Sequence, residues 1–185
     1  MSTIKLPDNF SRRVPDGDNL VRDVCETCGF ISYANPKLVV GSVVSAENDR
    51  ILLCKRAIEP RAGFWTLPAG YLELNETPDA GAAREAMEEA NAKIAIDCLL
   101  AVYAIPRISQ VQMIFRAKLD GPDFSPGPES EEVGLFTWDE IPWGDIAFPS
   151  VHWALGHFRE ASDLTGFPPF TNPEGVTGDR MIQGM

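Results

Sequence analysis

"GYLELNETPDAGAAREAMEEANA", residues 70–92, gathers six acidic side chains around a single basic one, Arg84. Thr77 followed by Pro78 is typical of a helix start, because the threonine hydroxyl can cap a free N–H and proline suits the first helical position. Asn91 is a suitable stop, since asparagine tolerates the left-handed backbone at a helix C-terminus. The stretch therefore predicts an acidic helix that starts after Thr77 and ends at Asn91.

The predicted helix has two unlike faces. With about 100° between successive residues, Glu85, Glu88 and Glu89 share one face, and we expect the opposite, buried face to hold Ala80, Ala83, Met87 and Ala90. Like charges three and four residues apart destabilise a helix by about 0.2–0.5 kcal/mol per pair. The carboxylate face is therefore either solvated or a site for divalent cations, since Mg²⁺ is usually held by a few carboxylates and substrate phosphates.

The spacing of this stretch resembles the Nudix box, the signature of the Nudix hydrolase family. The match consists of Gly70, Glu76 and the run Arg84–Glu89, and Asn91 stands where the box has its last glycine. The resemblance implies an α/β fold, the Nudix α/β/α sandwich with a mixed β-sheet between helices. It also implies substitution at phosphorus, with metal ions neutralising the charge that develops.

The resemblance assigns roles within the box. It implies that Glu85, Glu88 and Glu89 are catalytic and bind Mg²⁺ or Mn²⁺, with the carbonyl oxygen of Gly70 as a further ligand. It implies that Arg84 and Glu76 orient these carboxylates. We therefore expect a magnesium or manganese cofactor.

Several other stretches resemble one branch of the family, the Nudix hydrolases related to the plant FAD and ADP-ribose pyrophosphohydrolases and their bacterial relatives. They are NPKLVVG (35–41), LLCKRAIEP (52–60), GFWTLPAGYLE (63–73), PGPESEE (126–132) and DEIPWGDIAF (139–148). The branch implies Mg²⁺-dependent cleavage of an ADP-linked compound, such as FAD or ADP-ribose, into two monophosphates. A nucleoside triphosphate-sanitising pyrophosphatase and a non-catalytic module that senses ADP-ribose are the alternatives.

Four residues outside the helix are candidates for substrate binding. Arg56 and Arg61 could meet phosphates, or they could be solvated. Trp65 could stack on adenine or on a flavin ring, or it could belong to the core. Glu73 could join the metal site or simply be exposed.

The acidic loop 122–132 offers a further carboxylate. In many family members this loop supplies a metal ligand or a general base, which must come within hydrogen-bonding reach of the attacking water. Glu129, Glu131 and Glu132 are the choices, and we expect Glu132, next to the following strand, to take this catalytic role.

Cys25 and Cys28 form the motif CETC. A tetrahedral zinc site needs four ligands, and relatives in this branch often carry a second CxxC upstream, where this chain has no cysteine. The pair therefore resembles half of a degenerate zinc ribbon, which would bind zinc only with ligands from another chain. We expect residues 1–35 to form this ribbon-like extension, 36–165 the Nudix domain and 166–185 a C-terminal tail.

Composition limits the partners. The net charge is −11 and the pI is about 4.6, which disfavours nucleic acid as a general partner because phosphate is repelled. No run approaches the roughly 20 apolar residues of a membrane span, and the first residues lack the apolar stretch of a signal peptide. We expect a cytoplasmic enzyme with a small-molecule nucleotide substrate and neither a membrane nor a nucleic-acid partner. A homodimer stays open.

Overall fold

The structure is a computed structural model that describes residues 7–178. The chain divides into two compact units, one ending at Pro36 and the other beginning at Lys37. The first unit is a small antiparallel sheet of β1 (Phe10–Arg13), β2 (Arg22–Cys25) and β3 (Ile31–Ser32), in that order. The CETC motif forms the turn between β2 and β3, where Gly29 adopts a positive φ of 73°.

The second unit carries seven strands and two α-helices among the described residues. The strands are β4 (Lys37–Ser45), β5 (Ile51–Arg56), β6 (Trp65–Thr66), β7 (Ala69–Tyr71), β8 (Ile94–Ile105), β9 (Gln110–Leu119) and β10 (Ser130–Phe136). The helices are α1 (Pro78–Ala90) and α2 (Pro149–Glu160). Short 3₁₀ turns lie at Glu47–Asp49, Pro106–Ile108, Trp138–Glu140 and Trp143–Asp145.

The strands of the second unit form one mixed sheet. Its order is β10-β5-β4-β9-β8, and β6 and β7 pair with β5 and β4. Among the paired strands named above, β4 and β9 alone run parallel, over nine residue pairs from Lys37↔Gln110 to Ser45↔Lys118. The successive strands β4 and β5 have the β-rich sequences of a hairpin, but they pair at Ser45↔Ile51 alone. Each strand instead finds its long partner elsewhere, β9 for β4 and β10 for β5.

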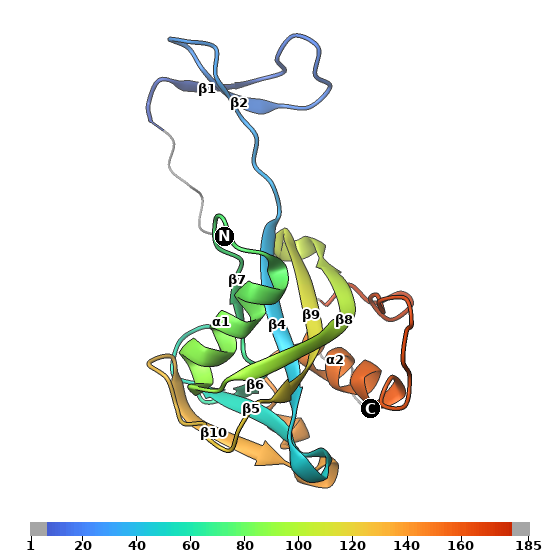
Figure 1. Cartoon of the computed structure of the whole chain (residues 1–185). Coiled ribbons are helices and arrows are strands. Elements are labelled where there is room, and N and C mark those ends of the chain that lie inside the picture. Colours follow the sequence, from blue (N-terminus) through green and yellow to red (C-terminus); the bar gives the residue numbers. More distant parts are fainter. Residues whose placement is uncertain (1–6, 179–185) are drawn as a thin grey trace. The chain divides into compact units, whose positions relative to one another are not determined.

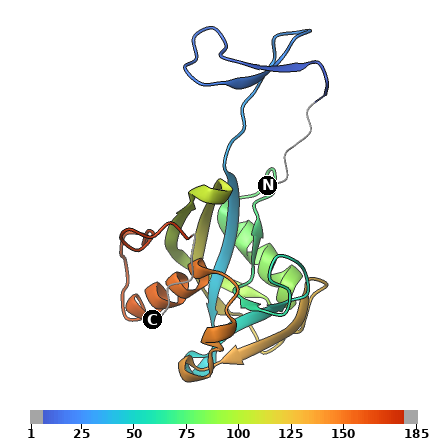
Figure 2. The same cartoon turned by 180° about the vertical axis from the view of Figure 1, so that it is seen from behind.

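The alternation of side chains along the central strands separates two helical layers. On β4, Val40 and Val44 lie in the clusters that α1 covers, whereas Val43 lies in the larger cluster with α2. Successive side chains of a strand point to opposite faces, so the two helices cover opposite faces of the sheet, as Figures 1 and 2 show. The predicted α/β fold, an α/β/α sandwich with a mixed sheet, is confirmed.

Helix α1 has the ends that its sequence predicts. Pro78 is its first residue, and Asn91 follows its last residue in the left-handed conformation, with φ 46° and ψ 30°. The expected cap is wrong, because the Thr77 side chain bonds no backbone N–H of the helix; it contacts the Asp79 carboxylate instead.

The buried face of α1 also differs from the prediction. Ala82, Ala86 and Ala90 are fully buried against the sheet, and Met87 is 45% exposed. Glu85 and Glu89 are buried as well, because they point between the helix and β7 and not toward bulk solvent. No described helix has the length and apolar character that a membrane crossing requires.

The described part of the expected C-terminal tail packs on the second unit. The Phe170 N–H donates to the Leu100 carbonyl and the Val102 N–H to the Phe170 carbonyl, both at 2.9 Å. The Asn172 side chain bonds both backbone groups of Ala104, and Gly178 lies against Ile105 and Trp153. Residues 166–178 therefore lie along β8, the edge strand, and pair with it through a single bridge between Phe170 and Ala101.

Candidate active site

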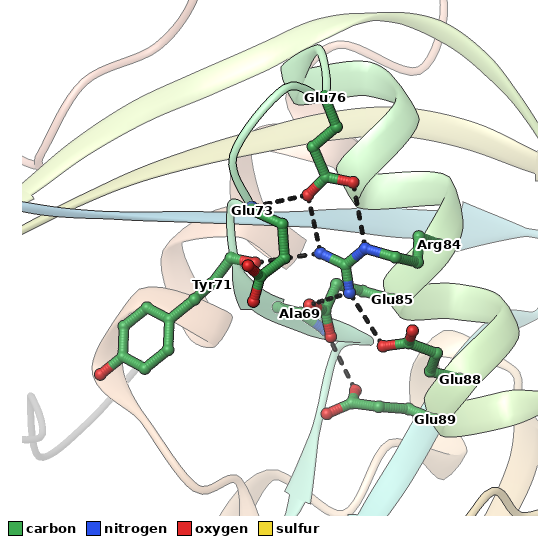
Figure 3. A network of polar contacts seen from close by, with 8 residues as sticks. All are labelled: Ala69, Tyr71, Glu73, Glu76, Arg84, Glu85, Glu88 and Glu89. Carbon is green, nitrogen blue, oxygen red and sulfur yellow. Dashed lines mark hydrogen bonds and ion pairs between the residues drawn. The ribbon is translucent and has the colours of Figure 1, made fainter.

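Arg84 is the centre of the polar network on α1. Its guanidinium donates to both carboxylate oxygens of Glu76, at 3.0 and 2.8 Å, and to the Tyr71 carbonyl at 3.0 Å. Its Nη1 donates to Glu85 and to Glu88, each at 2.8 Å. Figure 3 shows the guanidinium between the Glu76 carboxylate on one side and Glu85 and Glu88 on the other. One cation thus fixes three carboxylates that come from the helix and from the loop before it.

The pKa values of this pair follow from these bonds. The Arg84 guanidinium, helped by the Glu73 N–H, lowers the pKa of Glu76 to about 2. In turn, the hydrogen bond to Glu76 raises the pKa of Arg84 above its ordinary value. Both groups are therefore charged at neutral pH, and their ion pair is a fixed support for the rest of the network.

The two buried carboxylates are held in a different way. Burial raises the pKa of Glu85, and the adjacent Arg84 partly opposes this effect. Burial also raises the pKa of Glu89, to about 7, although the Ala69 N–H donates to its Oε2 at 3.0 Å. Removing a carboxylate from water penalises its charged form. A cation in the cleft would offset this penalty. The hydrogen bond from the Ala69 N–H comes from the backbone, so no pattern of side chains in the sequence indicates it.

Gly70 explains how a strand can lie so close to these carboxylates. It is the central residue of β7 and pairs with Val40 of β4. A side-chain carbon at position 70 would overlap the carboxylate of Glu85. Glycine is therefore required here for close approach, which places its backbone beside the predicted metal ligands.

These residues line a large cleft of about 1230 Å³. One wall is α1 with β7, and a second wall is the end of the β8–β9 hairpin, including Arg107, Gln110 and Gln112. The loop after β5, the tip of the acidic loop and the start of α2 complete it. The cleft brings together Glu85, Glu88, Glu89, Gly70, Arg84, Glu73, Arg56 and Arg61. Glu76 supports Arg84 from outside the lining.

The two arginines expected to meet phosphates both line the cleft. Arg56 donates to the Pro60 carbonyl at 2.9 Å, and its charge helps to stabilise the Glu89 carboxylate. Arg61 donates to the Ala147 carbonyl at 3.2 Å, and its guanidinium carbon lies 3.7 Å from the ring centre of Phe64. These contacts use one Nε–H of each arginine, so the remaining N–H groups can serve an anionic ligand.

Trp65 does not line the cleft. It is 8% exposed and belongs to the core cluster under α2, where its ring packs edge to face on Phe136 at 4.9 Å. The expectation that it stacks on a substrate is therefore corrected, and its role is packing. The physical reason is the alternation along β6: the neighbouring Thr66 lines the cleft, so the tryptophan points to the other side.

Glu132 also lies away from the cleft lining. The register of β10 against β5 shifts between Ser130 and Glu132, a bulge, and both Glu131 and Glu132 contact Lys55, at 3.9 and 3.8 Å. Glu129 lines the cleft instead, and its charge is close enough to raise the pKa of Glu85 and Glu89. Of the three carboxylates considered on this loop, Glu129 is therefore the one in the cleft lining.

The donor set suits a hard divalent cation. Carboxylate oxygens are the ligands that Mg²⁺ and Mn²⁺ prefer, and Glu85 and Glu88 already share one positive nitrogen of Arg84. Among residues 7–178, however, no three acidic, histidine or cysteine side chains converge as a ready-made metal site. Arg84 draws Glu85 and Glu88 together while the Ala69 N–H holds Glu89, so closing three ligands on one ion requires side-chain rotation.

The N-terminal unit does not fit a zinc ion by itself. Up to Pro36 the sequence holds two cysteines and no histidine. Cys25 is buried and Cys28 is exposed, and Asn9 donates its side-chain amide to the Cys25 sulfur at 3.2 Å. Two thiols leave a tetrahedral site half complete, as the sequence indicates.

Comparison with known proteins agrees with this geometry. A model described as NUDIX domain matches residues 35–154, and one described as Nudix N-terminal, a zinc ribbon, matches residues 8–34. The crystal structure of a NUDIX hydrolase from Nitrosomonas europaea is 51% identical, covers 88% of this chain and 93% of its own, and superposes with a TM-score of 0.81.

Two curated relatives are less similar. A MutT-like protein from Streptomyces ambofaciens is 39% identical over 102 residues, which make up 55% of this chain and 64% of the relative. An ADP-ribose pyrophosphatase from Methanocaldococcus jannaschii is 29% identical over 114 residues, or 60% of this chain and 67% of the relative. The first alignment therefore spans less than two thirds of the relative's own length.

Proposed function

This chain belongs to the Nudix hydrolase family, and we propose that it is a divalent-metal-dependent pyrophosphohydrolase that cleaves an ADP-linked diphosphate into two monophosphates. Water adds to one phosphorus atom and the bridging oxygen leaves with the other phosphate, so that ADP-ribose would give AMP and ribose 5-phosphate. The relative from Methanocaldococcus jannaschii, an ADP-ribose pyrophosphatase, supports this class of substrate.

The observation that carries the proposal is the shared position of Glu85 and Glu88. Both carboxylates lie 2.8 Å from the same nitrogen of Arg84, on the wall of the cleft that also holds Glu89. Arg84 offsets the repulsion between these two carboxylates, so they are already gathered at the cleft, where a divalent cation could bind them. We propose that Glu85, Glu88 and Glu89, beside Gly70, hold Mg²⁺ or Mn²⁺ here.

Each group has a distinct task in the proposed reaction. A bound metal would polarise the diphosphate and lower the pKa of the attacking water. The Glu76–Arg84 pair positions Glu85 and Glu88, and Arg56 and Arg61, from β5 and the loop after it, would bind phosphate oxygens. Glu129, at the tip of the acidic loop, would accept the proton of the water.

The size of the cleft supports a substrate with two large groups. Small-molecule pockets measure about 300–1,000 Å³, and this cleft exceeds that range. Beyond the carboxylates it continues to the β8–β9 hairpin, where Gln110 and Gln112 present amides. With a diphosphate at the carboxylates, the remaining volume would have room for a nucleoside and a second group such as ribose or flavin.

A substrate panel tests this function. The purified full chain with Mg²⁺ should release two monophosphates from ADP-ribose or FAD, and a chelator should stop the release. Glu88→Gln should lower kcat by at least about 100-fold, whereas the control Glu47→Gln, at an exposed turn outside the cleft, should not change it. Hydrolysis of nucleoside triphosphates alone, or tight binding of ADP-ribose without any product, would refute the proposal.

A further inference from the structure

We propose that Asn91 is a positioning residue, whose side-chain amide holds the acidic loop on the end of α1 so that Glu129 faces the cleft. The inference rests on the proposed function in one respect, the role of Glu129 as the base. The hydrogen bonds that make up this latch do not depend on that role.

The Asn91 amide reaches directly across to the loop. Its Nδ2 donates to the Ser125 carbonyl at 3.1 Å, the Ser125 hydroxyl at 3.2 Å and the Pro126 carbonyl at 3.1 Å. An amide has two N–H donors, so the three acceptors share them. Thirty-four residues separate Asn91 from Ser125 along the chain, which makes this a tertiary contact.

The loop returns hydrogen bonds to the helix. The Ser125 N–H donates to the Ala90 carbonyl at 2.8 Å, and the Gly127 N–H donates to the Glu89 carbonyl at 2.9 Å. The last carbonyls of a helix lack partners within it, and here the loop supplies them. A side-chain carbon at Gly127 would overlap the Glu88 carbonyl oxygen, so helix and loop are in close contact.

This latch ends two residues before Glu129. On its other side, the Glu129 carbonyl accepts the Ala57 N–H at 2.8 Å. Glu129 is therefore fixed between the end of α1 and the loop after β5. The same helix end carries Glu88 and Glu89, so one short segment sets the distance between the metal-binding carboxylates and the proposed base.

The helix end itself does not require the asparagine side chain. Asn91 has φ 46°, a conformation that glycine adopts more easily than any other residue, and the Nudix box has glycine here. The hydrogen bonds of the side-chain amide go to the loop, at Ser125 and Pro126. Asparagine in place of the last glycine of the box therefore adds side-chain hydrogen bonds between the end of α1 and the acidic loop.

The first test is a double-mutant cycle on hydrolysis of ADP-ribose. Asn91→Gly should lower kcat about tenfold, a part of the contribution of a general base, with KM changed less than about twofold. In the Glu129→Gln background the same substitution should change kcat less than about twofold, because the group that it positions is gone. An equal loss in both backgrounds, a rise in KM alone, or unchanged kcat would overturn the role.

The second test needs no turnover. Amide hydrogen exchange should quicken at Ser125 and Gly127 in Asn91→Gly and stay at the parent rate in Asn48→Gly, a matched control at another exposed asparagine with positive φ, 58°. Unchanged exchange at the loop would overturn the latch itself. If the parent hydrolyses none of the substrates, the proposed function fails. The latch is still supported in that case if exchange at Ser125 and Gly127 is faster in Asn91→Gly and unchanged in Asn48→Gly.

Discussion

Glu89 shows most clearly how burial and function conflict at a single residue. It is 6% exposed, and the Ala69 N–H donates a hydrogen bond to its carboxylate. Its pKa of about 7 in the folded chain lies above the ordinary value of 4.5. Between these two pH values the folded protein keeps a proton that the unfolded chain has lost, so the free energy of unfolding falls as pH rises.

Glu89→Gln should therefore stabilise the metal-free protein in a pH-dependent way. In the presence of a chelator, we expect its Tm to exceed that of the parent by several degrees at pH 8, since about 1 kcal/mol shifts a protein of this size by about 2–4 °C. At pH 5 the difference should vanish, because Glu89 is then protonated. Differential scanning calorimetry at both pH values measures this, and an equal Tm at pH 8 would contradict the raised pKa.

Arg84 sets the geometry of the remaining carboxylates. Its guanidinium forms ion pairs with Glu76, Glu85 and Glu88. It is also the one basic side chain in residues 70–92. The sequence indicates its importance in two ways, through its isolation among acidic residues and through its place in the stretch that resembles the Nudix box. Its five donors in a fixed plane explain why a lysine could not replace it.

Among the elements, α1 was the most predictable from sequence. Pro78 and Asn91 act locally through backbone conformation, so both ends could be placed without knowing the fold. The buried face could not, because it depends on where β7 lies. Gly70 lets β7 approach Glu85, and that contact is set by the pairing of β7 with β4.

Long-range strand pairing limited the other predictions. The parallel pairing of β4 with β9 and the bulge in β10 have no local signature, and the bulge decides that Glu132 meets Lys55 while Glu129 lines the cleft. The substrate-binding role considered for Trp65 is wrong for a related reason. Neighbouring residues of the short strand β6 point to opposite sides, so Thr66 lines the cleft while Trp65 lies in the core.

The segment after α2 packs on the second unit, although its composition is typical of a tail. Phe170 stacks on His157 with ring centres 4.4 Å apart, and it bridges to β8 at Ala101. We expect Phe170→Ala to lower the free energy of unfolding by about 1–3 kcal/mol, less than for a fully buried ring because Phe170 is half-buried. Urea unfolding of the full chain measures this change. A loss below about 0.5 kcal/mol would mean that the segment does not support the sheet.

For the molecule as a whole, acidic side chains outnumber basic ones by 27 to 16. The cleft lining follows the same balance, with the four arginines Arg56, Arg61, Arg84 and Arg107 beside six glutamates. A net charge of −11 repels free phosphates, so a bound divalent cation would have to offset the glutamates before the arginines could attract a diphosphate. The acidic composition therefore fits a small anionic substrate better than a long nucleic acid.

Binding of Mn²⁺ to the full chain, followed by the electron paramagnetic resonance of the free ion, tests the central claim most directly. The parent and the control Glu47→Gln should bind at least one Mn²⁺ per chain. Glu85→Gln should weaken that binding by at least about tenfold, with its circular dichroism spectrum unchanged. Equal Mn²⁺ affinity in the parent and Glu85→Gln would contradict the account, because the carboxylates around Arg84 would then not be the metal site.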